Sequence, residues 1–215
     1  MRRFFVFCAA ALAVAGSFAA PARAEEGPGD GTSPWLLRLR GVAVIPNASA
    51  SIDQVPGADA SIDTSVVPEL DVNYFFTPNI SSELILAVTP HRVKGRGALE
   101  GVDIGKAWLL PPTLTLKYHL TSLGAFRPYV GAGLNYTIFF NEHAAGGTIT
   151  QLDVHNTVGG AVQAGFDYFL DKHWGVNLDM KRLFLRPGVS LNNGTLTGTL
   201  AIDPWIVGGG IVYRF

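Results

Sequence analysis

The chain has 215 residues, of which 48% are hydrophobic and 15% are charged, and its formal net charge is −1. The basic residues form no run, which excludes nucleic acid as a partner. The mean hydropathy is +0.26, yet beyond the N-terminal segment no apolar stretch approaches the ~20 residues of a membrane-spanning helix. Because only helices and closed barrels satisfy their backbone hydrogen bonds in lipid, this composition favours a β-barrel.

The first predicted element is a signal peptide. Two arginines precede an apolar run from Phe4 to Ala20, and Ala22-Arg23-Ala24 matches the small-x-small cleavage pattern. We expect residues 1–24 to be removed and residues 25–215 to form one outer-membrane domain. Three of the 16 basic residues leave with the peptide, so 13 remain against 17 acidic ones, a net charge near −4. The single cysteine, Cys8, leaves as well, which excludes a disulfide, a thiol nucleophile and a cysteine-bound metal.

Eight segments then alternate apolar and polar residues with period two, as β-strands do. The predicted strands are Trp35–Ile45, Val66–Phe76, Ser81–Pro90, Trp108–Leu120, Arg127–Phe140, Val158–Leu170, Trp174–Leu185 and Pro204–Phe215. Short turns alternate with four long loops rich in Gly, Asn, Asp and Thr, at Pro46–Ser65, His91–Ala107, Asn141–Thr157 and Arg186–Asp203. This pattern predicts an all-β fold, an eight-stranded antiparallel transmembrane β-barrel, with its short turns in the periplasm and its long loops outside the cell.

The two faces of the predicted strands differ in polarity. One face is apolar and bears aromatic residues at its ends, as a face in contact with lipid does. A soluble barrel of the lipocalin type would turn its apolar face inward, but here the inward face carries the charges. The aromatic residues predicted to form girdles at the two membrane interfaces are Trp35, Trp108, Trp174, Trp205 and Tyr213.

Charged side chains are predicted to line the lumen in equal numbers of each sign. The inward cations are Arg38, Arg40, Lys117, Lys181 and Arg214, and the inward anions are Glu69, Asp71, Glu83, Asp167 and Asp179. Eight strands enclose a space just wide enough for side chains to fill. The charges therefore have two interpretations: a polar constriction that selects solutes, or an ion-paired plug that blocks flow. For the periplasmic half, the plug is favoured.

Strand three presents apolar residues to the lumen. Ile85 and Ala87 share the inward parity of Glu83, so the lumen is expected to become apolar nearer the outside. This change suggests that a small hydrophobic solute enters from outside, stops at the polar layer and leaves sideways into the membrane; packed core is the alternative. Pro90 and Pro112 either open the wall for such an exit or simply end strand pairing, and the second interpretation is favoured.

The final strand ends on an aromatic residue. Phe215 follows alternating apolar residues, a pattern similar to the signal that the barrel-assembly machinery reads. We expect this residue to act in assembly.

Three blocks carry a family resemblance: Leu110-Pro111-Pro112-Thr113-Leu114, the segment from Phe126 to Thr137, and the closing segment from Asp203 to Phe215. They resemble the outer-membrane protein W family of Gram-negative bacteria, and the resemblance covers essentially the whole predicted mature chain. It implies an eight-stranded outer-membrane barrel with a narrow, partly hydrophobic interior, associated with passage of small hydrophobic compounds and with envelope stress. The charged segment from Asp179 to Arg182 departs from the aromatic-containing segment of some relatives.

We expect the protein to be a narrow channel for passive passage of small hydrophobic molecules. The alternative is a non-transporting barrel that acts as a receptor, adhesin or envelope-stress protein, with outer-membrane lipids and lipopolysaccharide as its surroundings. No cofactor is expected. The five histidines show no metal-ligand spacing, and no Ser–His pair shares an outward face, so neither a metal site nor an enzyme is expected.

Overall fold

A computed structural model describes residues 33–215 as fifteen strands, and the predicted signal peptide lies outside this range. The strands are β1 (Trp35–Ile45), β2 (Ser49–Ile52), β3 (Ala58–Ile62), β4 (Ser65–Phe75), β5 (Ile80–Leu86), β6 (Thr89–Gly97), β7 (Asp103–Leu110), β8 (Thr113–His119), β9 (Phe126–Ala144), β10 (Leu152–Val154), β11 (Thr157–Phe169), β12 (Trp174–Phe184), β13 (Gly188–Leu191), β14 (Leu196–Ala201) and β15 (Trp205–Arg214). Within the described range, no helix has the length and apolarity that crossing a membrane requires.

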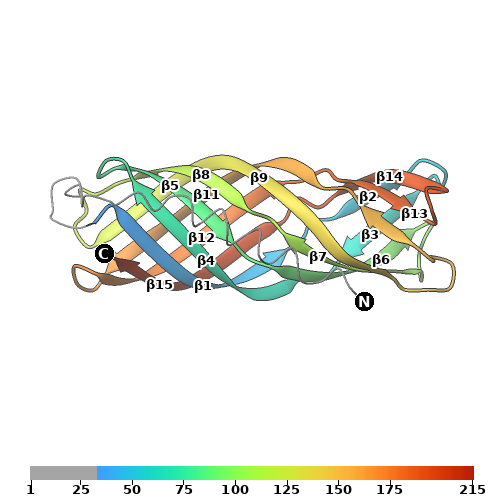
Figure 1. Cartoon of the computed structure of the whole chain (residues 1–215), viewed down its shortest axis with the longest axis horizontal. Coiled ribbons are helices and arrows are strands. Elements are labelled where there is room, and N and C mark those ends of the chain that lie inside the picture. Colours follow the sequence, from blue (N-terminus) through green and yellow to red (C-terminus); the bar gives the residue numbers. More distant parts are fainter. Residues whose placement is uncertain (1–32) are drawn as a thin grey trace, which may run out of the picture.

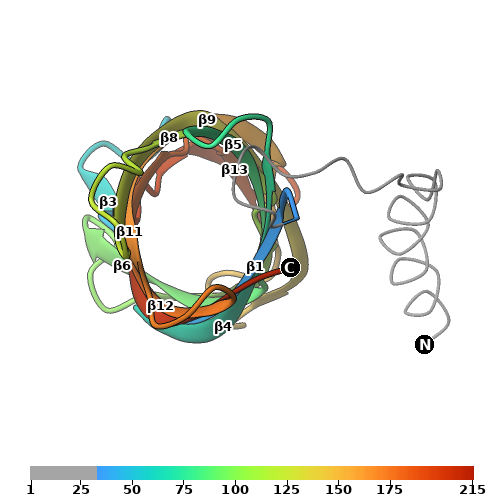
Figure 2. The ribbon, with the colours of Figure 1, turned by 90° about the vertical axis from the view of Figure 1, so that its left-hand side faces the viewer.

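Eight of these strands close into a barrel. The order of hydrogen-bonded neighbours is β1-β4-β5-β8-β9-β11-β12-β15, and β15 returns to β1 in an antiparallel register from Leu36 opposite Arg214 to Ile45 opposite Trp205. Figure 2 shows the closed ring and Figure 1 shows its length. The predicted eight-stranded antiparallel barrel is therefore confirmed.

Two predicted strands are in fact divided. The segment predicted as Ser81–Pro90 contains β5 and the start of β6, and the segment predicted as Trp108–Leu120 contains the end of β7 and all of β8. Pro90 lies within β6 and stays paired with Trp108 of β7, so it does not end the pairing on that side. At Pro112 the wall stays connected to β9, because the Pro112 carbonyl accepts the N–H of Tyr136 at 3.0 Å.

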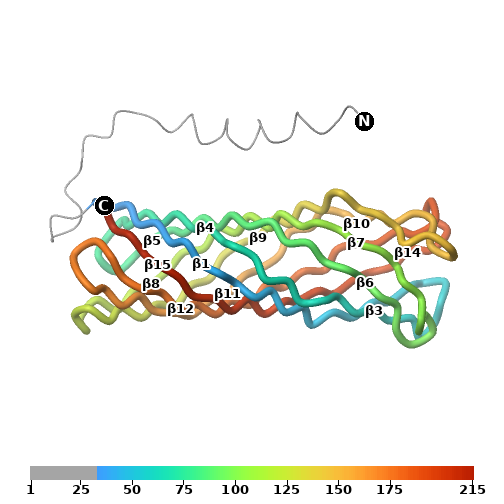
Figure 3. The backbone as a smooth tube through the Cα atoms, turned by 90° about the horizontal axis from the view of Figure 1, so that it is seen from below, coloured from blue at the N-terminus to red at the C-terminus, as the bar shows by residue number. Residues whose placement is uncertain are grey.

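The four long loops were also predicted incorrectly, because strands occupy part of each of them. Beyond the eight-stranded ring, β9 continues outward and pairs with β7, which pairs with β6, which pairs with β3. Strands β10, β13, β14 and β2 form a separate four-stranded sheet. These strands lengthen the tube at one end of the molecule, as Figure 3 shows.

The polarity of the strands inverts along the barrel. In β8, Leu116 faces outward and is 60% exposed, whereas Lys117 faces inward and is 1% exposed. In β6 the pattern is the opposite, since Val93 is buried while Arg92 and Lys94 are exposed. The surroundings explain the change: an outward apolar side chain is favourable where lipid covers the wall, and an outward polar one where water does.

Candidate functional site: a polar layer below an apolar chamber

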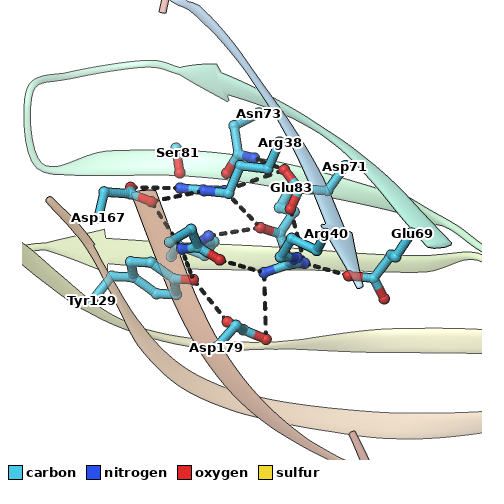
Figure 4. A network of polar contacts seen from close by, with 12 residues as sticks. Arg38, Arg40, Glu69, Asp71, Asn73, Ser81, Glu83, Tyr129, Asp167 and Asp179 are labelled. Carbon is cyan, nitrogen blue, oxygen red and sulfur yellow. Dashed lines mark hydrogen bonds and ion pairs between the residues drawn. The ribbon is translucent and has the colours of Figure 1, made fainter. Parts of the chain in front are cut away.

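The lumen is crossed by a layer of charged side chains centred on Arg38 of β1. Its guanidinium donates to both carboxylate oxygens of Asp167 on β11, at 2.9 and 2.7 Å. The remaining terminal nitrogen donates to Asp71 on β4 at 3.2 Å and to Glu83 on β5 at 3.0 Å. One arginine thus connects three acidic residues from three different strands (Figure 4).

Arg40 repeats this arrangement one step further along β1. It forms ion pairs with Glu69 at 2.5 Å, with Asp71 at 2.8 Å and with Asp179 on β12 at 3.5 Å. It also donates to the side-chain oxygen of Asn177 at 3.2 Å. Because Asp71 contacts both arginines, the two groups of ion pairs form one network.

Two lysines complete this network from other strands. Lys117 on β8 donates to Glu83 at 2.6 Å and lies 3.6 Å from the ring centroid of Tyr129. Lys181 on β12 lies 3.9 Å from both Glu83 and Asp179. The phenol of Tyr129 donates to Asp179 at 2.7 Å.

These nine charged side chains, which we call the polar layer, are only 0–7% exposed. The layer comprises Arg38, Arg40, Glu69, Asp71, Glu83, Lys117, Asp167, Asp179 and Lys181. It therefore fills the cross-section of the barrel instead of lining an aqueous pore. Burying charges costs free energy, which attraction repays only when the geometry is good and further hydrogen bonds are made. The contacts of Arg38 meet that condition, whereas Nζ of Lys181 lies 3.9 Å from its two carboxylates and makes no hydrogen bond within the described residues.

Below the polar layer, at the periplasmic end, the lumen is closed by a small apolar cluster. It consists of Leu36, Phe75, Phe169 and Val212. The guanidinium of Arg214 lies 5.3 Å from the Phe75 ring centroid, so this predicted lumen residue belongs to the periplasmic end.

Above the polar layer, the lumen becomes an apolar chamber built largely by the extended wall. Its residues include Ile52, Val93, Ile104, Leu152, Val189 and Leu191, together with parts of β1 and β15. A cavity of about 30 Å³ remains among them.

Ile85 is buried but belongs to neither apolar cluster, and it pairs with Asp71 and Thr113. It therefore lies at the border of the polar layer, and the chamber itself lies further outward than the sequence suggested; Ala87 packs against its edge.

The chamber wall has a weak point between β4 and β6. Pairing of β4 with β5 ends at Leu70 opposite Leu86, so the outer part of β4 has no ladder partner on that side. A groove of about 390 Å³ lies here, with Ser65, Val66, Pro90 and Trp108 among its lining residues. We call it the wall groove.

Pro90 contributes to this weak point through its missing N–H. The N–H of Arg92 donates to the Asp63 carboxylate at 2.6 Å, toward the β3–β4 side. Alternate residues of a strand direct their N–H groups to the same side, so a donor at position 90 would face β4. Proline supplies none, and it thereby leaves this edge unpaired.

Outward aromatic residues gather at two levels. At the periplasmic level, Trp174 contacts Tyr213 with 4.7 Å between ring centroids, and Trp35 contacts Tyr74 at 4.9 Å. At the outer level, Trp108 lies 6.4 Å from Phe140, and Trp205 lies under the guanidinium of Arg182. The residues predicted as girdles therefore lie at both ends of the lipid-facing surface.

The structure contains a Ser–His pair that sequence reasoning missed. The hydroxyl of Ser81 and Nε2 of His119 are 2.8 Å apart, on the inward faces of β5 and β8. Parity assigns both residues to the inward face, but it does not give the strand register that brings them into contact. Both residues are buried near the periplasmic end of the lumen. Among residues 33–215, no group of three or more His, Cys, Asp or Glu side chains could hold a metal ion.

The acidic residues of the first long loop accept hydrogen bonds from neighbouring outer strands. Asp59 accepts the N–H groups of Ala50 and Ala60, and Asp63 accepts that of Arg92. Asp53 accepts the hydroxyl of Thr197. These contacts hold the outer strands together and do not gather the carboxylates into a cation site.

Lipid-facing strands, a closed ring and a polar interior define an outer-membrane β-barrel. The sequence model of the OmpW family matches residues 34–215, and the chain belongs to this family. It is 51% identical to the uncharacterized outer-membrane protein y4mB of Sinorhizobium fredii, over 99% of this chain and 92% of that protein. It is 31% identical to outer membrane protein W of Escherichia coli, over 96% and 97% of the two chains. A third relative, the dibenzothiophene metabolism operon protein DoxH of a Pseudomonas strain, is 30% identical over 92% of this chain and 93% of its own.

Solved structures show the same architecture. The crystal structure of OprG from Pseudomonas aeruginosa superposes with a TM-score of 0.79 at 27% identity, covering 88% of this chain and 98% of that chain. The solid-state NMR structure of AlkL in lipid bilayers gives a TM-score of 0.63 at 26% identity, covering 91% and 95%. The chain therefore resides in the outer membrane, as the sequence predicted.

Proposed function

We propose that this barrel allows small hydrophobic molecules to pass from the outside into the membrane by passive diffusion. The observation that carries the proposal is the order of layers in the lumen: an apolar chamber on the outer side and a closed polar layer beneath it. A hydrophobic solute is stabilised in the chamber by loss of contact with water. It is stopped at the polar layer, because insertion there would separate buried ion pairs.

The small volume of the cavity limits the solute and requires side chains to move. About 30 Å³ holds only one or two water-sized molecules, so an entering solute must displace side chains such as Val93 and Leu191. Displacement in the chamber exchanges one set of apolar contacts for another. Displacement in the polar layer offers no such replacement, and this difference directs the solute to the side.

The wall groove offers that sideways exit. It lies beside the chamber, at the edge of β4 that lacks a ladder partner, and its lower rim is formed by Val66, Pro90 and Trp108. Opening the wall here breaks few backbone hydrogen bonds. In addition, relatives are named as proteins of a dibenzothiophene metabolism operon, and dibenzothiophene is an apolar aromatic compound.

Uptake into liposomes tests this function. Liposomes that contain the refolded protein should take up a small hydrophobic compound faster than empty liposomes, and a sugar of similar size should show no such difference. Ser65 lines the wall groove from an inward-facing, buried position. The variant Ser65→Trp should fill the groove and lose most of the uptake of the hydrophobic compound.

The matched control is Ser122→Trp, which adds the same side chain in an exposed periplasmic turn. It should transport like the wild type. Uptake of neither compound by the wild-type protein would refute the channel and favour the non-transporting alternative. Uptake that Ser65→Trp leaves unchanged would remove the sideways exit while retaining the channel.

We further propose that Phe215 acts in assembly. Its N–H donates to the carbonyl of Trp35 at 3.3 Å, and its ring packs edge-on against Tyr213 at 4.9 Å, where the first and last strands meet. Deletion of Phe215 should lower the amount of protein in the outer membrane several-fold without lowering its synthesis. Fractionation and immunoblotting measure both quantities. Phe215→Tyr, which keeps the terminal ring, should assemble normally, and equal levels after deletion would refute the assembly role.

A further inference from the structure

The outer surface of β6 and β7 carries a group of basic residues that the proposed channel does not use. Arg92, Lys94 and Arg96 occupy successive outward positions of β6, and Lys106 faces outward on β7. All four are exposed. Arg92 and Lys106 stand opposite each other in the strand register. We call these four residues the basic patch.

The basic patch is not explained by ion pairing within the protein. Among the described residues, none of the four cations forms an ion pair, whereas Arg186 is paired with Asp203 and Arg182 lies over the ring of Trp205. Three carboxylates are close in the register: Asp63 accepts the backbone N–H of Arg92, Asp103 stands opposite Lys94, and Asp59 stands opposite Arg96. Four unpaired cations on one side of a barrel indicate a surface suited to an anionic ligand.

The height of the patch identifies the kind of anion. The pair Arg92–Lys106 lies two residues outward from the pair Pro90–Trp108, which is about 7 Å along the strands. Trp108 belongs to the outer aromatic level, and such residues lie at the boundary between hydrocarbon and head groups. Arg92 and Lys106 are therefore at the level of the head groups of the outer leaflet.

The wall groove has a charged part and an apolar part. Two cations, Arg92 and Lys106, and one anion, Asp63, line the groove, and Val66, Pro90 and Trp108 line the part that faces the hydrocarbon. An amphiphile with an anionic head and an acyl chain matches this order, head group above and chain below. We propose that the basic patch and the wall groove bind the phosphorylated head group of a glycolipid of the outer leaflet, the lipid A portion of lipopolysaccharide. This binding does not require that solutes leave by the groove.

Titration of the folded full-length protein in detergent micelles with bisphosphorylated lipid A tests the proposal. Wild-type protein should bind it about tenfold or more tightly than dephosphorylated lipid A, because charge-assisted hydrogen bonds to phosphate are lost with the phosphates. The double variant Arg92→Gln/Lys106→Gln should lose about tenfold in affinity for the phosphorylated lipid for the same reason. Raising the ionic strength should weaken wild-type binding.

Two controls separate this effect from misfolding and from general charge. Lys172→Gln removes an exposed cation from a periplasmic turn and should bind lipid A like the wild type. The exchange Arg92→Lys/Lys106→Arg keeps both charges and should retain most of the affinity. Heat-modifiable mobility on gels verifies that each variant is folded. Equal wild-type affinity for phosphorylated and dephosphorylated lipid A, or a folded double variant that binds like the wild type, would overturn the proposal.

Discussion

Replacing Arg38 by methionine is expected to lower the free energy of unfolding by about 3–5 kcal/mol, the cost of breaking a buried ion pair by removing one partner. The effect falls in the upper part of this range because Arg38 contacts Asp71, Glu83 and Asp167 at once. All three carboxylates are essentially inaccessible to solvent, so water cannot replace the lost donors. Urea titration of the reconstituted protein, followed by tryptophan fluorescence, measures the change.

The control for Arg38→Met is Lys172→Met. It also removes one positive charge and introduces the same side chain, but at an exposed position in a turn between β11 and β12. Its unfolding free energy should change by no more than about 0.5 kcal/mol. A loss below about 1 kcal/mol for Arg38→Met would contradict the description of the polar layer as a dry, closed network.

A charge on the lipid-facing surface is expected to have the second largest effect. Leu134 of β9 is 68% exposed and lies near the middle of the stretch between Phe126 and Phe140, which mark the two ends of the lipid-facing surface. Leu134→Arg should lower the unfolding free energy in bilayers by about 2–4 kcal/mol, as expected for arginine near the bilayer midplane. Leu123→Arg makes the same exchange in a periplasmic turn and should change stability by less than about 0.5 kcal/mol. Similar losses in both variants would mean that Leu134 does not face lipid.

The membrane-spanning part of the fold was predictable because lipid imposes one rule on every strand. The segment Trp35–Ile45 was predicted with the bounds that β1 has in the structure, and the closing strand differs from β15 by one residue at each end. Outside the membrane the polarity of the two strand faces is reversed: polar residues face outward and apolar residues face inward. In β13, for example, Val189 and Leu191 are buried and the outer face is in contact with water. The small and polar residues of such strands are typical of loops, and loops were therefore predicted there.

Contacts across the lumen could not be predicted for a different reason. Parity gives the face on which a side chain lies but not the height at which strands pair, so the inward charges were predicted without their partners. Arg38 and Asp167 are 129 residues apart in sequence, and their contact depends on the register of every strand between them. The hydrogen bond between Ser81 and His119 depends on register in the same way.

The closing seam between β1 and β15 gives the buried ion pairs a consequence for alignment. Gly208, Gly209 and Gly210 face Val42, Gly41 and Arg40 across this seam, and strands so rich in glycine specify their register weakly. A slip of two residues would keep every side chain on its own face and would preserve the backbone hydrogen-bond pattern. However, it would move Arg38 and Arg40 away from Asp167 and Asp179, which lie on strands beyond β15. The arginines of β1 therefore favour a single register between β1 and β15 when the barrel closes.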